Sequence, residues 1–134
     1  MTNKQKANIV IREVGHEFMV SETFVRCPRD GYANEELAHD VAVFILSTLI
    51  GSSKTAAQFG ASKSAVFNTS AKVNGAFATD PKFALRAGIV TGFVMQNIDE
   101  HERQEAIIMR GRKFGKTAWA TEMAKRRFGP KEAA

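Results

Sequence analysis

Apolar and polar positions alternate in two early stretches of the chain and recur with a helical period in most of the rest. Residues 8–14 and 17–26 alternate in this way and are rich in Ile, Val and Phe, with Gly15 and His16 between them. Two alternating stretches joined by a short turn predict a β-hairpin. Residues 1–7 are mostly polar, and we expect them to be disordered.

From residue 34 onward the spacing predicts helices. Asn34 is the expected N-cap of a helix that ends at Gly51, and two shorter helices are expected at 54–59 and 63–73, before a stop at Asn74 and Gly75. Three further helices are expected after them. Their predicted starts are Asp80 followed by Pro81, Asp99, and Lys116, the last helix running to Phe128.

The two short helices form the most informative pattern in the chain, GSSKTAAQFGASKSAVFN at residues 51–68. Ala56 is small enough for a second helix to pass close by, and Phe59 and Val66 are placed to pack beneath the crossing. Gly60 supplies a left-handed turn residue, and Ser62 is the expected cap of the second helix. This arrangement is typical of a helix-turn-helix, in which one helix holds the other in the DNA major groove.

The second helix of this motif has four outward positions whose chemistry suits base edges. Lys63 can donate to guanine, Asn68 can pair with adenine, Ser64 suits a base or a phosphate, and Phe67 suits a thymine methyl group. Ser52, Ser53 and Thr55 would bind phosphate at the start of the first helix. The alternative is an ordinary pair of small-residue helices in the core, with Lys63 simply solvated.

The motif resembles the helix-turn-helix of phage Cro repressors. It is also similar to that of the stage III sporulation protein D transcription factors, whose motif likewise contains Phe-Gly followed by Ser-Lys-Ser. The resemblance covers about residues 51–70 and implies a DNA-binding regulator that reads bases from Lys63, Ser64, Phe67 and Asn68. Phe67 departs from the pattern, which is usually polar there, and Thr69 and Ser70 are weak helix formers, so a short reading helix is expected.

The charge is uneven along the chain. The net charge is +5, and residues 51–134 hold most of the basic side chains. Such a surface is expected of a protein that meets phosphates, although an acidic protein partner would also suit it. The basic C-terminal residues expected to bind phosphate are Arg110, Arg112, Lys113, Lys116, Lys125, Arg126 and Arg127. A solvated helix face is the alternative for this set.

A second motif, residues 106–117, is an apolar run that leads to Gly-Lys-Thr. It resembles the divergent phosphate loop of viral DNA-packaging ATPases. Arg110 stands where the first glycine of that loop belongs, and only seventeen residues follow Thr117, too few for the remaining strands and the magnesium-binding carboxylate of such an enzyme. A basic C-terminal element is therefore the preferred interpretation.

The sequence offers no other catalytic or metal-binding pattern. His16, His39 and His101 are scattered, and Cys27 has no evident activating base, so structural roles are expected for all four. One cysteine, no signal-peptide pattern and no apolar run of bilayer length predict a cytoplasmic protein. We expect a DNA-binding protein without cofactor or metal, and not an enzyme.

Together these features predict a mainly helical α+β fold. The expected parts are an N-terminal β-hairpin (1–31), a helix-turn-helix domain (32–97), and basic C-terminal helices and tail (98–134). The predicted function is sequence-specific binding of double-stranded DNA by a dimeric regulator, because one short helix reads too few base pairs alone. Two alternatives remain: a phage-type interaction or assembly protein with a basic tail, and the DNA-recognition subunit of a packaging machine.

Overall fold

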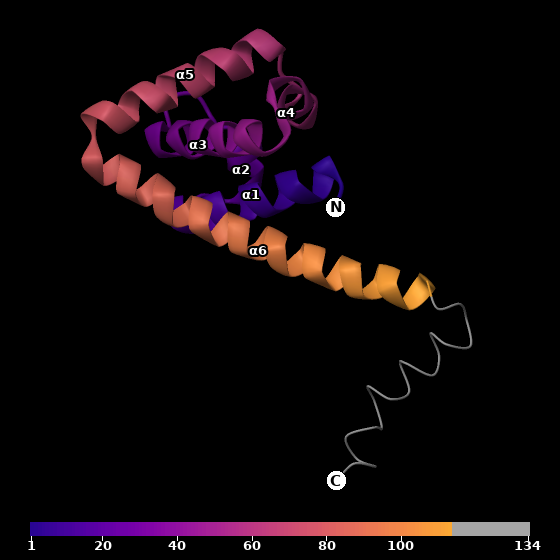
Figure 1. Cartoon of the computed structure of the whole chain (residues 1–134). Helices are drawn as coiled ribbons and strands as arrows, with labels where there is room; N and C mark the ends of the chain where they lie inside the picture. The colour runs from indigo at the N-terminus through magenta and orange to yellow at the C-terminus, as the bar shows by residue number, and fades with distance from the viewer. Residues whose placement is uncertain (114–134) are drawn as a thin grey trace. The chain divides into compact units, whose positions relative to one another are not determined.

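In a computed structural model, the chain forms helices and turns throughout the described region, which comprises the backbone of residues 1–113 and the side chains of residues 1–110. The described helices are α1 (Asn3–Phe18), α2 (Glu22–Arg26), α3 (Ala33–Ile50), α4 (Ser52–Phe59), α5 (Lys63–Thr79) and α6 (Pro81–Lys113) (Figure 1). Residues 1–113 contain no β-strand. The expected β-hairpin and the α+β class are therefore wrong.

Helix α1 replaces the first strand of the expected hairpin. Its innermost residues, Ala7, Val10, Val14 and Phe18, are spaced three or four apart, which is the period of a helix. The Thr2 side chain accepts a hydrogen bond from the Gln5 N–H, and the Gln5 side chain accepts one from the Thr2 N–H. This capping box starts the helix within the stretch expected to be disordered. Burial of the helical face outweighs the strand preference of the β-branched residues.

A close turn joins α1 to α2. Gly15 is buried, and a Cβ atom built on it would lie 2.7 Å from the Val20 carbonyl oxygen, so only glycine fits there. The Nδ2 amide of Asn34 donates to the Phe18 carbonyl (2.7 Å), which joins the end of α1 to the start of α3. Asn34 is thus not the N-cap of α3, because the helix begins at Ala33 and its N-cap is Tyr32.

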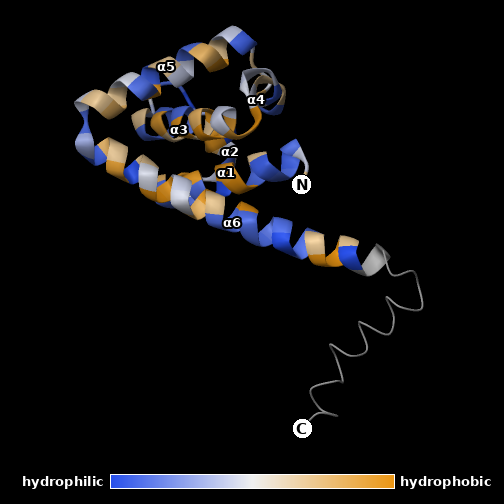
Figure 2. Ribbon diagram, viewed as in Figure 1, coloured by the Kyte–Doolittle hydropathy of each residue, from blue (hydrophilic) through white to orange (hydrophobic). Residues whose placement is uncertain are grey.

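Helix α3 is the centre of the core. It packs against α1, α2, α4 and α5, and Figure 2 shows apolar residues along much of its length. Ala38, Val41, Ala42 and Leu46 are fully buried. A helix that is covered on several sides must be apolar around most of its circumference, as α3 is. Gly51 ends it with a positive φ of 88°, as expected from the sequence.

Three later helix boundaries also differ from expectation, and the first is that α4 begins at Ser52 rather than at residue 54. Asn74 and Gly75 do not stop α5, which continues to Thr79 because Val73 is buried in the main core and Phe77 packs against it. Asp99 does not start a new helix, since α6 runs unbroken from Pro81 to Lys113. The expected start at Asp80 and Pro81 is confirmed: the Asp80 carboxylate accepts from the Phe83 N–H at 3.1 Å.

The chain divides into two compact units, Met1–Ile98 and Asp99–Ala134. Within the first unit, the early part of α6 contributes Phe83, Val90 and Val94 to the same core as α1 and α3. Two polar contacts attach it to α1. An Arg86 guanidinium nitrogen donates to the Glu17 carbonyl (2.9 Å), and the Asn97 amide donates to the Glu13 carboxylate (3.0 Å).

Candidate nucleic-acid interface

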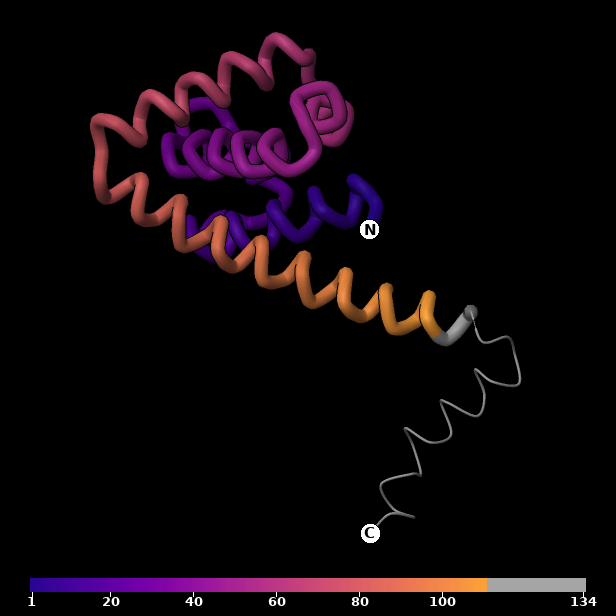
Figure 3. The backbone as a smooth tube through the Cα atoms, in the orientation of Figure 1, coloured from indigo at the N-terminus to yellow at the C-terminus, as the bar shows by residue number. Residues whose placement is uncertain are grey.

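Helices α4 and α5 form the bihelical unit that the sequence predicts. Figure 3 shows α4 nearly end-on while α5 runs across the view, so the two helices cross steeply. Gly60 ends α4 in the left-handed conformation (φ 63°), and the Ala61 N–H donates to the Ala56 carbonyl at 3.0 Å. Ser62 then caps α5, because its hydroxyl accepts from the Ala65 N–H at 3.1 Å. The expected turn and cap are confirmed.

A small apolar cluster holds the two helices together. Ala56 of α4, Val66 of α5 and Val43 of α3 are buried against one another, and Phe59 packs beside them. The His39 ring lies edge-on to Phe59, with ring centroids 5.3 Å apart. The expected packing of Ala56, Phe59 and Val66 is thus confirmed. This cluster packs α5 against α3 and α4 through Val66.

All four expected base-reading residues are exposed on α5. Lys63, Ser64, Phe67 and Asn68 are exposed, and 67 % of the Phe67 surface is accessible. Their spacing of one, three and four residues places them together at the N-terminal end of α5.

Helix α5 is longer and better anchored than expected. It has 17 residues. Ser70 is half-buried, and its hydroxyl lies 3.0 Å from that of Ser47 on α3. Each hydroxyl is within hydrogen-bonding distance of the other, which ties the middle of α5 to α3. The weak helix formers Thr69 and Ser70 therefore do not shorten α5, and the expectation of a short second helix is wrong.

The surface of this unit is free of acidic residues. Residues 41–79 contain no Asp or Glu, and they include Lys54, Lys63 and Lys72. Lys72 is paired with Asp40 of α3 at 2.8 Å, and the carboxylate raises the pKa of Lys72 above its usual value. Lys54 is exposed on α4 and was missed as a candidate, although the acid-free stretch around it is visible in the sequence. Within the described part of the chain, an ion pair with a carboxylate is seen for Lys72 but not for Lys54 or Lys63.

The expected phosphate-binding residues of α4 divide into two groups. Ser53 is exposed and Ser52 is half-buried at the first turn of the helix, where the first backbone N–H groups have no acceptor within the helix. Thr55 is fully buried, and its hydroxyl has no hydrogen-bond partner within the described part of the chain. Thr55 therefore faces the core rather than a phosphate.

The basic C-terminal set lies largely beyond the described structure. Arg110 is exposed on α6. Arg112 and Lys113 belong to the same helix, but their side chains lie outside the described part, as do Lys116, Lys125, Arg126, Arg127 and the helix expected at 116–128. Residues 106–113 are helical, whereas the strand of a phosphate loop would have to precede Gly-Lys-Thr. This removes the structural context that the second motif requires.

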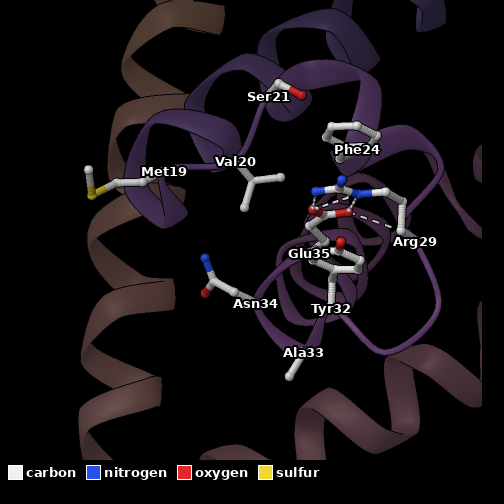
Figure 4. A pocket seen from close by; sticks show the side chains of 9 residues that line it. All are labelled: Met19, Val20, Ser21, Phe24, Arg29, Tyr32, Ala33, Asn34 and Glu35. Carbon is white, nitrogen blue, oxygen red and sulfur yellow. Dashed lines mark hydrogen bonds and ion pairs between the residues drawn. The ribbon is translucent and has the colours of Figure 1, made fainter.

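A recess of about 460 Å³ lies where α1, α2 and α3 meet (Figure 4). The Arg29 guanidinium is stacked between the rings of Phe24 and Tyr32, 4.0 and 3.8 Å from their centroids. It is also paired with Glu35, whose carboxylate additionally accepts from the Arg29 backbone N–H at 3.1 Å. Hydrogen bonding from Arg29 lowers the pKa of Glu35 below its usual value. The two charged groups satisfy each other, so this recess offers little to a charged ligand.

His39 and Cys27, two other residues considered in the sequence, have different environments. The His39 Nδ1 lies 2.7 Å from the Val25 carbonyl, which only accepts, so this nitrogen carries the proton and joins α3 to the end of α2. Cys27 is an exposed free thiol. Among the described residues, no group of three or more His, Cys, Asp or Glu is arranged to hold a metal ion. No helix in the same region has the length and apolar character needed to span a membrane.

No protein-family model, curated protein or solved structure matches the chain.

Proposed function

We propose that this protein binds double-stranded DNA sequence-specifically through the exposed N-terminal face of α5, as a cytoplasmic transcriptional regulator. One observation carries the proposal. Lys63, Ser64, Phe67 and Asn68 are all exposed near the start of a helix that is packed through Val66 against a steeply crossing partner helix. This is the geometry by which a helix enters the major groove.

The chemistry of the face supports base reading. A lysine suits the O6 and N7 acceptors of guanine, and the Asn68 amide offers the donor and acceptor that adenine requires. The start of α4, with Ser52 and Ser53, would hold a backbone phosphate and set the register of α5 in the groove. The two helices contain no Asp or Glu, which avoids repulsion of the phosphates by their own side chains.

A protein partner is the second candidate for this face. Phe67 is large, apolar and exposed at its centre, a feature that also suits a protein interface. In that case the basic C-terminal residues would supply the electrostatic attraction. Salt-dependent retention on duplex DNA separates the candidates, because an assembly protein of this kind would not be retained.

The test begins with selection of duplexes from a randomised pool by the full chain. The affinity for an enriched duplex and for a scrambled one is then measured by fluorescence anisotropy at several salt concentrations. Lys63→Ala and Asn68→Ala should each lower the preference for the enriched duplex by about 5- to 150-fold, corresponding to about 1–3 kcal/mol per base contact.

Lys4→Ala is the matched control, since Lys4 is an exposed lysine on α1 and the change in charge equals that of Lys63→Ala. It should leave the preference unchanged. Equal losses on the enriched and scrambled duplexes for Lys63→Ala would overturn the assignment of α5 as the reading helix. Failure to enrich any duplex would overturn sequence-specific binding itself.

A further inference from the structure

Acidic and basic side chains are segregated along residues 1–79. Residues 1–12 and 41–79 contain six Lys or Arg and no Asp or Glu. Residues 13–40 contain seven Asp or Glu, against two arginines, Arg26 and Arg29. The acidic residues thus come from one continuous segment, and segments free of them precede and follow it.

The fold places the acidic segment and the acid-free segments at opposite ends of a helix pair. Helices α1 and α3 pack against each other, and the Asn34 amide joins the start of α3 to the Phe18 carbonyl at the end of α1. The two helices therefore run in opposite directions, and the start of α1 lies beside the end of α3, where α4 begins (Figure 1). Contacts between α1 and α4 agree with this placement. The last part of α1, all of α2 and the first part of α3 form the acidic end.

The opposite end, formed by the starts of α1 and α4, is the basic end. Lys4 and Lys54 are exposed on α1 and α4, and Lys6 is half-buried on α1. Within the described part of the chain, an ion pair with a carboxylate is seen for none of the three. The same end holds Ser52 and Ser53 at the first turn of α4. Positive charge therefore gathers around the helix start that is proposed above to hold a phosphate.

We propose that the start of α1 binds the DNA backbone, with Lys4 and Lys6 contacting phosphates next to the one held by the start of α4. The inference rests on the proposed function, and it adds a contact from outside the helix-turn-helix. Phosphate contacts position a protein on the duplex and carry no base information. The start of α1 should therefore raise the affinity for every duplex without changing the preference set by α5.

The charge of the two ends favours a duplex as the partner and fixes how the protein faces it. DNA carries about one negative charge per 1.7 Å of its axis, so it attracts the basic end and repels the acidic residues of 13–40. An acidic protein would also be attracted by Lys4 and Lys6. The basic end is, however, continuous through α4 with the helix-turn-helix, so one duplex can contact both.

The salt dependence of DNA affinity tests the contact. Fluorescence anisotropy of the full chain is measured on the enriched and the scrambled duplex from about 0.05 to 1 M salt. Lys4→Ala and Lys6→Ala should each make the slope of log affinity against log salt shallower by about 0.9, because one phosphate contact is lost. The same slope predicts a loss of affinity of about eightfold at about 0.1 M salt, vanishing near 1 M. The loss should be equal on both duplexes, so the base preference stays unchanged.

Two further variants separate a local contact from other effects. Lys82→Ala changes the net charge by the same amount at an exposed lysine near the start of α6, which lies across the first unit from the start of α1 (Figure 1). It should leave the slope unchanged. Lys4→Arg keeps the positive charge and should retain the slope of the original protein, whereas a loss of packing would not be rescued in this way. Circular dichroism should be unchanged for every variant.

The possible outcomes distinguish this inference from the proposed function. If Lys63→Ala lowers the base preference while Lys4→Ala and Lys6→Ala leave slope and affinity unchanged, the role of the start of α1 is overturned and the reading helix stands. That outcome includes the case in which an acidic protein binds the basic end. An equal change of slope in Lys82→Ala would also overturn the contact, because net charge alone would then account for the effect. Absence of any binding to duplex DNA would overturn both proposals.

Discussion

Val66 and Phe67 are neighbours on α5 with opposite environments, and substituting each by alanine tests the orientation of the helix. Val66 is 1 % exposed in the cluster with Val43 and Ala56, whereas Phe67 is 67 % exposed. Val66→Ala removes two buried methyl groups, with a transfer cost of about 1.6 kcal/mol at about 0.8 kcal/mol each. The residual cavity adds about 1 kcal/mol, so unfolding should become easier by about 2–3 kcal/mol.

The same substitution at Phe67 should change the free energy of unfolding by less than about 0.5 kcal/mol, although it removes a larger side chain. Urea denaturation followed by circular dichroism measures both values. If α5 enters the groove as proposed, the DNA affinity should respond differently, because Phe67→Ala would remove a groove contact while the fold is retained. If Phe67→Ala destabilised the protein as much as Val66→Ala, Phe67 would be covered in the folded chain and the exposed face of α5 would be misassigned.

Three other substitutions address the core and the ion pair. Gly15→Ala should destabilise the protein by about 2 kcal/mol or more, because the new methyl group meets the Val20 carbonyl. Thermal unfolding measures the loss, and an unchanged melting temperature would contradict the tight turn. Thr55→Val should raise the free energy of unfolding by about 1 kcal/mol, since it removes a buried hydroxyl without a partner in the described region. It should leave the DNA affinity unchanged. A specific loss of affinity would instead indicate that Thr55 binds phosphate. Glu35→Gln should be less stable than the original protein at neutral pH, because the lowered pKa of Glu35 means that its ionised form favours folding. That difference should begin to shrink as the pH falls through the ordinary glutamate value of 4.5, where the unfolded chain takes up the proton first. It should disappear once the pH is below the lowered pKa of Glu35 in the folded protein, where Arg29 loses its charged partner, and a pH-independent difference would contradict the linkage.

Local chemistry explains why the bihelical unit was predictable from sequence. Gly60 is the residue that best tolerates the left-handed turn, Ser62 has the hydroxyl that caps α5, and Ala56 permits a close crossing. These requirements act within a few residues of one another. Each is therefore readable without knowledge of the rest of the fold.

The N-terminal region was mispredicted because its composition and its burial pattern point in different directions. Ile9, Val10 and Ile11 favour a strand by their β-branched side chains, yet all three are buried in a helix that packs on α3. Tertiary burial thus decided the structure. Similarly, Gly75 is a poor helix former. The helix nevertheless continues through it, because Val73 before it is buried in the core and Phe77 after it packs against that core.

The candidate site was predictable in outline but not residue by residue. Helical spacing placed Lys63 and Asn68 outward, and the structure agrees with both positions. The same reasoning could not recognise that Thr55 faces inward, because that depends on where α3 lies against α4. The pairing of Lys72 with Asp40 is likewise a contact between helices that sequence spacing does not contain.

The most direct test of the central claim is to map the DNA contacts on the protein by NMR. Backbone amide shifts of the full chain are followed during titration with an enriched duplex and with a scrambled one. The proposal predicts that the largest changes occur at the start of α4 and at the start of α5 around Lys63 and Asn68, and that those on α5 differ between the two duplexes. Changes confined to residues 110–134, or identical for both duplexes, would contradict sequence reading by α5.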